Sequence, residues 1–287
     1  HKGMPVLGDT LKFLKDPMGL QRQNYSDYGT VYKARTFMQW NVTMLGPDAL
    51  EMVLMDREKN FSSKLGWSHM LRRLFSDGLM LRDFDDHRAH RRIMQVAFTP
   101  APMKDYLLRM NGGIEARLDE WSKMSEFKFY PAIKELTLDL GASVFLGLDM
   151  GPESRRINQA FIDDVAAAVS VVRRPVPGLA MARGVKARKF LNEFFRDLIP
   201  VRRAGNGDDM FTQLCQAESE DGQKLSDQEI IDHLNFLLMA AHDTTTSSLT
   251  TMFWALAAFP EWQERIRAEV AEIGGTHLTY DRMGDMD

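Results

Sequence analysis

The longest stretch of helical hydrophobic periodicity lies between Ser226 and Phe259. Ser226 and Glu229 have the spacing of a capping box, and Pro260 disfavours helical geometry at the residue before it. The pattern therefore predicts one helix of about 33 residues, on the order of 50 Å long at about 1.5 Å per residue. Because apolar residues cover one face of its first half and most sides of its second half, we expect a central core helix. These apolar positions are Ile230, Leu234, Leu237, Leu238, Ala241, Phe253, Trp254, Leu256 and Ala257.

Two short segments, residues 30–37 and 41–45, are rich in β-branched and aromatic residues and predict a β hairpin. Ahead of them, residues 3–17 are expected to form an ordered loop, followed by a helix through Tyr28 that Gly29 ends. Helical periodicity dominates after the hairpin. We therefore expect a mainly α fold with a long central helix and a small N-terminal β hairpin. The other predicted helices span residues 50–55, 86–97, 102–121, 131–146, 153–171, 185–203, 208–217 and 261–273.

The composition is that of a soluble globular protein. The 287 residues are 44% hydrophobic and 26% charged, enough to bury a sizeable core in one large domain or two ordinary ones. A net charge of −4 argues against a nucleic-acid binder with a global basic field, and no apolar run approaches the ~18 to 20 residues of a membrane span. The single cysteine, Cys215, excludes internal disulfides and favours a reducing, cytoplasmic setting. The sequence begins at His1 without a signal-peptide pattern, which leaves an upstream membrane anchor open.

Consecutive polar residues at positions 242–248 interrupt the apolar pattern of the long helix. Thr and Ser are mediocre helix formers, and their hydroxyls compete for backbone carbonyls. The acid among them, Asp243, must find a partner in a buried helix or change its protonation state. These costs indicate a function for the run. The alternative is a solvated face, or a hydroxyl-lined contact with another helix.

The run and its neighbours resemble the oxygen-activation signature of the cytochrome P450 family of haem-thiolate monooxygenases, in which small residues precede an acid and a threonine. Here the signature is Ala-Ala-His-Asp-Thr-Thr, residues 240–245. The resemblance covers the whole chain and implies a single cytochrome P450 domain over residues 1–287. That domain would be incomplete, because the family's Glu-x-x-Arg helix and haem-binding cysteine would follow Asp287. The other segments that resemble the family, in the family's own order, are residues 3–8, 60–63, 87–92, 98–100, 221–227 and 260–263.

The resemblance implies a role for each residue of the signature. Ala240 and Ala241 would leave room beside the helix for haem and O2. Thr244 would orient the distal oxygen, and bonding of its hydroxyl to a helix carbonyl or to a water would open a groove. Asp243 would feed protons from solvent. The axial cysteine would lie beyond Asp287, so no metal ligand is expected within the chain.

His87 and Arg91 stand four residues apart and share one face of a helix, where both can donate hydrogen bonds to a pair of carboxylates. By the resemblance, these carboxylates are the haem propionates. Arg88 and Arg92 form a second pair on another face, suited to docking an acidic electron-transfer partner. The alternative is an ordinary basic helix surface. Phe84 stands where the family commonly has Gly, which leaves the loop before this helix less well defined.

An apolar, Met-rich stretch lies between the hairpin and the propionate helix. In the family this region shapes the substrate pocket, so Phe75, Leu79 and Met80 are expected to bind substrate, with core packing as the alternative. Residues 173–179 would form a mobile access loop by the same analogy, or an ordinary linker. Cys215 has a helical context and no Gly-rich loop around it, which indicates a buried structural thiol and not the iron ligand.

The resemblance implies an enzyme, a haem-dependent monooxygenase that inserts one oxygen atom from O2 into a C–H bond of a hydrophobic small molecule. The substrate would be a sterol, terpenoid, retinoid, fatty acid or xenobiotic. Haem b is the expected cofactor, with electrons from NAD(P)H through a ferredoxin or a flavoprotein reductase. Without an axial thiolate, the chain alone is expected to be inactive. We expect a soluble, cytoplasmic monomer of bacterial type that binds no nucleic acid.

Two alternatives compete with this interpretation. The first is a peroxygenase or dehydratase relative, which would typically lack the pair formed by Asp243 and Thr244. The second is a haem-free helical protein that binds lipophilic molecules or other proteins. Such a protein would have no need of the His87 and Arg91 pair, so replacing both residues would leave its ligand affinity unchanged.

Overall fold

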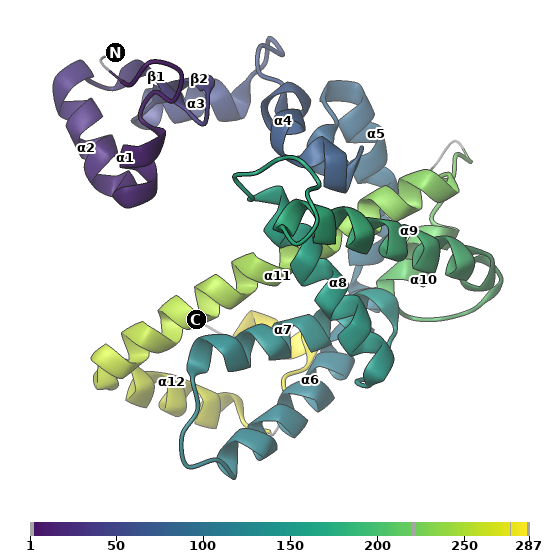
Figure 1. Cartoon of the computed structure of the whole chain (residues 1–287). Helices are drawn as coiled ribbons and strands as arrows, with labels where there is room; N and C mark the ends of the chain where they lie inside the picture. The colour runs from purple at the N-terminus through teal and green to yellow at the C-terminus, as the bar shows by residue number, and fades with distance from the viewer. Residues whose placement is uncertain (1–2, 220–221, 276, 286–287) are drawn as a thin grey trace. The chain divides into compact units, whose positions relative to one another are not determined.

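The computed structural model is mainly helical, as predicted, and describes residues 3–219, 222–275 and 277–285 (Figure 1). Backbone contacts divide the chain into two units, residues 1–62 and 63–287. No helix among the described residues is long and apolar enough to cross a membrane.

The first unit contains the predicted hairpin. Strands β1 (Val31–Thr36) and β2 (Gln39–Met44) pair antiparallel, with Val31 opposite Met44 and Thr36 opposite Gln39. Helix α2 (Pro17–Tyr28) ends at Gly29, whose φ of 84° suits glycine, as the sequence predicted. Helix α3 spans Pro47–Met55.

A short helix, α1 (Thr10–Lys15), lies where the sequence predicted only a loop. Its start is fixed by contacts distant in sequence. The Thr10 hydroxyl donates to the carbonyl of Leu7 at 2.5 Å and accepts the backbone N–H of Phe37 at 2.7 Å. A helix of six residues is too short for its hydrophobic period to be recognised in the sequence.

The second unit contains the other helices and three 3-10 turns, η1 (Leu79–Leu81), η2 (Gln95–Phe98) and η3 (Tyr280–Asp285). The long helix, α11 (Asp227–Ala258), is confirmed at both ends: the capping box of Ser226 and Glu229 is formed, and Phe259 ends the helix before Pro260. The remaining helices are α4 (Ser63–Phe75), α5 (Phe84–Met94), α6 (Pro100–Ser122), α7 (Phe129–Leu146), α8 (Pro152–Ala168), α9 (Ala180–Ala204), α10 (Met210–Gln216) and α12 (Pro260–Ile273).

Two of these helices differ from the sequence-based expectation. The apolar stretch ahead of the propionate helix forms α4, for which no helix was predicted. Helix α9 begins at Ala180 rather than at residue 185, and it continues past Pro200 to Ala204. At its start it packs tightly on α8, because a Cβ added to Gly184 would collide with the Cβ of Ala167.

The core of the second unit lies where α8, α9 and α10 pack on the first half of α11, and α7 packs farther along the same helix (Figure 1). Ile230, Ile231 and Leu234 on that half are completely buried. The second half differs from the expected core helix. There the side chain of Trp254 is 69% exposed and that of Phe253 is 48% exposed, although Phe253 stacks on Phe129 of α7 with 4.4 Å between ring centroids.

Candidate functional site

The polar run lies within the continuous helix α11, and two of its hydroxyls bond back to helix carbonyls. Thr244 Oγ1 donates to the carbonyl of Ala240 at 2.6 Å, and Thr246 Oγ1 donates to that of His242 at 2.9 Å. The two hydroxyls lie on different faces. His242 and Thr246 are buried, whereas Thr244 is exposed. The run therefore has an inner face toward the core and an open outer face.

Asp243 lies between these faces with a side chain that is 45% exposed. Its Oδ1 accepts a hydrogen bond from Lys134 Nζ of α7 at 3.2 Å, and the same oxygen is 3.4 Å from His242 Nδ1. Two nitrogens from different elements thus approach one carboxylate oxygen. Asp243, which was expected to need a partner in this helix, is therefore paired with Lys134 of α7.

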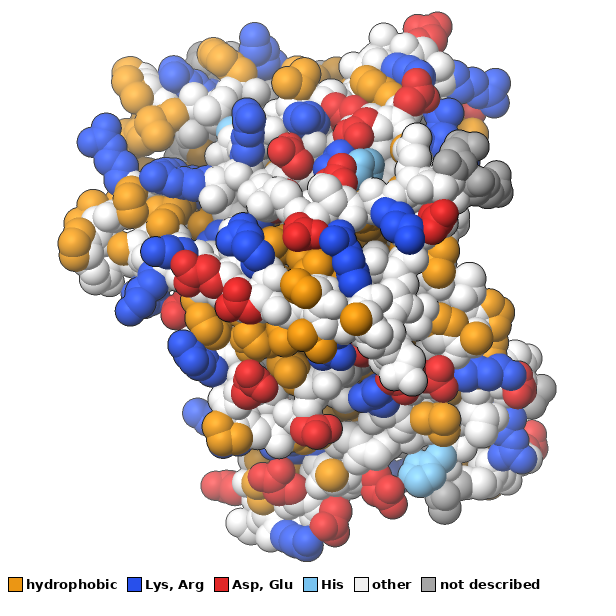
Figure 2. All heavy atoms as spheres, turned by 90° about the vertical axis from the view of Figure 1, so that its right-hand side faces the viewer, with side chains coloured by type: hydrophobic (Ala, Val, Ile, Leu, Met, Phe, Trp, Pro, Cys, Tyr) orange, Lys and Arg blue, Asp and Glu red, His pale blue; other side chains and the backbone are white. Residues whose placement is uncertain are grey.

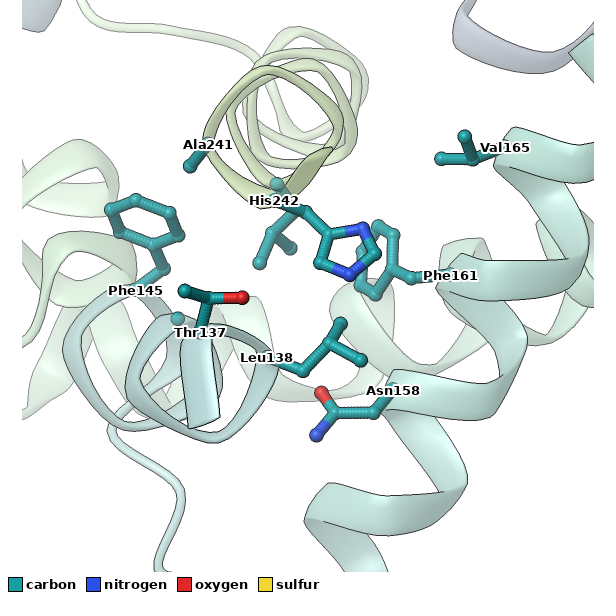
Figure 3. Close-up of a pocket in the computed structure, with 10 residues that line it drawn as sticks. Thr137, Leu138, Phe145, Asn158, Phe161, Val165, Ala241 and His242 are labelled. Atoms are coloured by element: carbon teal, nitrogen blue, oxygen red, sulfur yellow. The ribbon is translucent and has the colours of Figure 1, made fainter. Parts of the chain in front are cut away.

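His242 points from α11 into a small cavity beside α7 and α8 (Figure 3). Its side chain is 5% exposed, and burial lowers the pKa of its imidazole, with Lys134 acting in the same direction and Asp243 against it. The ring is therefore neutral at physiological pH. A second link between these helices lies close by, where the hydroxyls of Thr137 and Thr246 are 2.8 Å apart.

The two alanines of the signature do different things. Ala240 is half-buried and is tied to Thr244 by the hydroxyl-to-carbonyl bond, so these two share the outer side of α11. Ala241 instead lines the cavity with His242. Of the predicted pair, only Ala240 is thus joined directly to Thr244.

The predicted propionate ligands lie on α5. His87 is half-buried and Arg91 is exposed. Within the described residues, neither side chain makes a hydrogen bond or ion pair. Arg88 forms an ion pair with Asp85 at 3.4 Å, and Arg92 is exposed. The four cationic or polar side chains are thus accessible, and their roles stay predictions.

A buried histidine pair behind α5 is a feature that the sequence did not reveal. His90 Nδ1 of α5 is 2.9 Å from His233 Nε2 of α11, and Arg82 Nη1 is 2.8 Å from His90 Nε2. Because arginine only donates, His90 accepts at Nε2 and donates from Nδ1 to His233. Glu229 Oε1 lies 3.3 Å from the same Nε2. Helix α5 is thereby tied to the first half of α11.

A second buried cluster joins three helices and was also not predicted. Arg188 of α9 donates from Nη2 to Asp232 of α11 at 2.9 Å and to Ser76 at 3.2 Å. Asp164 of α8 is completely buried near this guanidinium, and burial raises the pKa of its carboxyl to about 7, against the opposing effect of Arg188. The Arg188–Asp232 pair ties α9 to α11, whereas neither carboxylate oxygen of Asp164 has a hydrogen-bond partner among the described residues.

Of the predicted substrate-binding residues, Phe75 ends α4, whereas Leu79 and Met80 lie in η1 between α4 and α5. Phe75 is buried in a cluster with Leu74 and Leu81. Met80 packs on that cluster beside Met239 of α11, whereas Leu79 packs on the main core. Leu79 and Met80 keep partial exposure. These contacts bring the stretch next to the helix that carries Thr244, and its role in a substrate pocket stays a prediction.

The predicted access loop, residues 173–179, is anchored at its start. The Arg173 guanidinium donates to the carbonyls of His69 and Met70 on α4 and to that of Ala168 at the end of α8. The loop therefore begins from a fixed point between these two helices.

Cys215 lies in the main core on α10 and is 4% exposed. Burial raises the pKa of its thiol to about 12. A thiol that stays protonated is a poor metal ligand, because the thiolate is the binding form. Among the described residues, no group of three or more His, Cys, Asp or Glu side chains is arranged to bind a metal ion.

Positive and negative side chains are interspersed on the face of the molecule shown in Figure 2, and neither sign collects into a large field. This distribution agrees with the small net charge of −4. On this face there is no broad basic surface of the kind that attracts nucleic acid.

Comparisons with known proteins agree with the resemblance. The cytochrome P450 family model matches residues 1–287. The chain is 37% identical to cytochrome P450 136 of Mycobacterium tuberculosis, over 99% of this chain and 59% of that protein. It is 25% identical to taxane 13-alpha-hydroxylase of Taxus cuspidata, over 99% of this chain and 61% of that protein. Among solved structures, retinoic acid-bound cyanobacterial CYP120A1 matches with a TM-score of 0.86 and 26% identity, over 99% of this chain and 65% of that one. The chain thus spans less than two thirds of the length of these relatives.

Proposed function

Because the chain belongs to the cytochrome P450 family, we propose that it is part of a haem-dependent monooxygenase that inserts one oxygen atom from O2 into a C–H bond of a hydrophobic small molecule. The observation that carries this proposal is the outer face of α11. There the family's threonine, Thr244, is exposed next to the small side chain of Ala240, on a helix whose other face is packed into the core.

The residues present fit a haem group. Ala240 and Thr244 give α11 an outer face without bulky side chains, and His87 and Arg91 present accessible donors on α5 for two carboxylates. When bound with an axial thiolate, haem iron supplies the binding and activation of O2. The thiolate would come from a segment beyond Asp287, since the thiol of Cys215 is buried in the core. The 287 residues alone are therefore proposed to be inactive.

Thr244 and Asp243 would manage protons at this face. The Thr244 hydroxyl now donates to the Ala240 carbonyl, and rotation about its side chain would aim the same proton away from the helix. Asp243 is half-exposed, so its carboxylate can exchange protons with solvent when Lys134 moves away. A carboxylate and a hydroxyl at adjacent positions can thus take a proton from water and hold it at the outer face.

The substrate class is proposed from the lining and from the relatives. The Met-rich segment that carries Leu79 and Met80 suits a large lipophilic ligand. One relative is named as a taxane hydroxylase, and one solved relative holds retinoic acid. We favour a terpenoid, a retinoid or a similar lipophile, with electrons from NAD(P)H through a ferredoxin or a flavoprotein. Arg88 and Arg92 would contribute to docking that partner.

The test uses the full-length protein purified with its cofactor. Its reduced form under carbon monoxide is expected to show the absorption band of a thiolate-ligated haem. Replacing both His87 and Arg91 by Leu should lower the haem content after gel filtration. The matched control replaces Arg88 and Arg92 on the same helix and should retain haem. No haem in the unchanged protein would instead favour the haem-free carrier. Full haem retention in both double variants would remove His87 and Arg91 from the haem site.

A further inference from the structure

A small enclosed space lies on the inner side of α11, opposite the face that carries Thr244 (Figure 3). Its volume is about 20 Å³, which is enough for one water molecule and too little for a substrate. Helices α7, α8 and α11 enclose it. The polar part of its lining consists of Thr137, Asn158 and His242, and the rest is Gly or apolar.

The imidazole of His242 extends into this space with unused hydrogen-bonding capacity. Neither ring nitrogen has a hydrogen-bond partner among the described residues, although the side chain is only 5% exposed. Nδ1 faces Asp243 Oδ1 at 3.4 Å, which is too long for a strong bond. Nε2 is on the other side of the ring. Because an unpaired buried polar group is costly, the geometry calls for a partner at Nε2.

Asn158 supplies a fixed polar group on the opposite wall. Its Nδ2 donates to Asp139 Oδ1 at 3.0 Å, and Asp139 Oδ2 accepts from Arg117 at 2.7 Å. The carboxamide of Asn158 is therefore held in one orientation, with its oxygen end available to the cavity. The Thr137 hydroxyl is already engaged with Thr246 and with the carbonyl of Lys134.

We propose that this cavity is a water site, and that its water links His242 Nε2 to Asn158, so that His242 positions the Asp243 carboxylate from the inner side of α11. The role of His242 in positioning Asp243 for proton delivery rests on the proposed function. The presence of the water between His242 and Asn158 does not. Water that donates to Nε2 leaves the ring proton on Nδ1, where it faces Asp243. The water thereby selects the tautomer that aims a donor at the acid.

This arrangement sets two nitrogens of different mobility beside Asp243: Lys134 Nζ, which donates to Oδ1 at 3.2 Å, and His242 Nδ1, which lies 3.4 Å from the same oxygen. Lys134 has a side chain that is partly exposed and flexible, whereas the His242 ring is enclosed on every side by packed helices. When Lys134 leaves, His242 would still hold the carboxylate in place. The charged groups that bear on His242 are Asp243 and Lys134 at one end and the pair of Arg117 and Asp139 behind Asn158. His242 is thus a positioning residue and not a catalytic one.

The first test locates the water directly. A crystal structure of the full-length protein is expected to show one water within hydrogen-bonding distance of both His242 Nε2 and Asn158. Histidine labelled with 15N in the ring then reports the tautomer by NMR in the diamagnetic reduced carbon-monoxide form. His242 is expected to carry its proton on Nδ1. A dry cavity, or a proton on Nε2, would overturn the proposal.

The second test displaces the water without altering a polar group. Gly141 lines the cavity, and a Cβ added there would meet only Phe145 Cδ2 at 4.0 Å, so Gly141→Ala should fold and fill the space. In Gly141→Ala, His242 should no longer prefer to carry its proton on Nδ1, because the water at Nε2 is gone. Its imidazole should also titrate at a lower pH than in the unchanged protein. Gly112→Ala, where an added Cβ meets nothing within 4 Å, is the matched control and should change neither.

Identical His242 tautomers and midpoints in Gly141→Ala and the unchanged protein would contradict the proposal. Should Gly141→Ala not fold, Asn158→Leu provides the same readout through loss of the opposite partner. If the full-length protein binds haem, the labels are read in its diamagnetic reduced carbon-monoxide form. If it is purified without haem, it is already diamagnetic and the same labels are read directly. Failure of haem binding would therefore reject the proposed function and leave the water site to be judged separately.

Discussion

The Nδ1 atom of His90 lies 2.9 Å from Nε2 of His233, and this bond crosses from α5 to α11 between residues 143 positions apart. Both rings are buried. Burial is the main cause that lowers both pKa values, and Arg82 adds to the effect on each. The pair is therefore neutral in the folded protein. Only a neutral His90 can accept from Arg82 at Nε2 while it donates from Nδ1 to His233.

Acid should weaken the fold through His233. Its pKa falls from 6.5 to about 3 on folding, so between these values the unfolded chain binds more protons, and the free energy of unfolding decreases as the pH is lowered. The decrease amounts to at most about 1.4 kcal/mol per pH unit for one group. Urea unfolding at pH 7, 6 and 5 should show a shallower pH dependence for His233→Gln than for the unchanged protein. His69→Gln, at an exposed position, is the control, and equal slopes in all three proteins would contradict the prediction.

Removing the Thr244 hydroxyl should impair chemistry and spare the fold. Thr244 is exposed, and within the described part of the chain its hydroxyl bonds only to the Ala240 carbonyl. Thr244→Ala should therefore change the free energy of unfolding by no more than ~0.5 kcal/mol. Product formed per NAD(P)H consumed should fall by about tenfold or more, as expected for loss of a proton-transfer group. Thr251 is exposed and makes the same type of bond to the Ser247 carbonyl at 3.0 Å, so Thr251→Ala should keep full coupling. Equal coupling in both variants would remove Thr244 from the mechanism.

Breaking the buried ion pair behind the cavity should be costly. The Arg117 side chain is 12% exposed and donates to Asp139, whose carboxyl pKa is raised by burial and lowered by this arginine. Arg117→Met should lower the free energy of unfolding by about 3–5 kcal/mol at pH 7. The loss should become smaller as the pH is lowered, because burial raises the pKa of Asp139 and protonation removes its unpaired charge. Lys123→Met breaks an exposed pair with Asp119 and should cost less than about 1 kcal/mol. Comparable urea midpoints for the two variants would show that the buried pair is not special.

The contact between α8 and α9 should tolerate no side chain at Gly184. An added Cβ would collide with Ala167 and lie 3.1 Å from the Asp163 carbonyl oxygen, so Gly184→Ala should destabilise the protein by about 1–3 kcal/mol. Gly112 lies in the interior of α6 with open space around it, and Gly112→Ala should stabilise by about 0.5–1 kcal/mol. Thermal unfolding of the two variants should therefore shift in opposite directions. A rise for Gly184→Ala would mean that α8 and α9 are less closely packed.

The elements whose ends are set by local chemistry could be predicted from the sequence. The start of α11 follows from Ser226 and Glu229, and the end of α2 follows from Gly29. Helix α4 lacked such signals, since its first turn has no acid and its apolar residues give no clear stop. Apolar character also predicted burial of Trp254, but periodicity does not say which segment covers a face.

The candidate site could be predicted only in part, for a related reason. The signature on α11 is contiguous, so Asp243 and Thr244 could be read directly from the sequence. Their partners come from other helices: Lys134 lies 109 positions before Asp243. The pair of His90 and His233 and the cavity beside His242 depend on long-range packing in the same way. No spacing within one segment of the sequence reveals them.

Glu229 serves two elements with one carboxylate. Its Oε2 accepts from the backbone N–H of Ser226 at 2.8 Å and so caps α11, while its Oε1 lies 3.3 Å from His90 Nε2 and 3.7 Å from Arg82 Nη2. Because neutral His90 accepts at Nε2, the link from Glu229 to α5 runs through the Arg82 guanidinium, which contacts both side chains. Helices α5 and α11 are therefore coupled, and local opening at this junction should expose the backbone amides of both helices to exchange together.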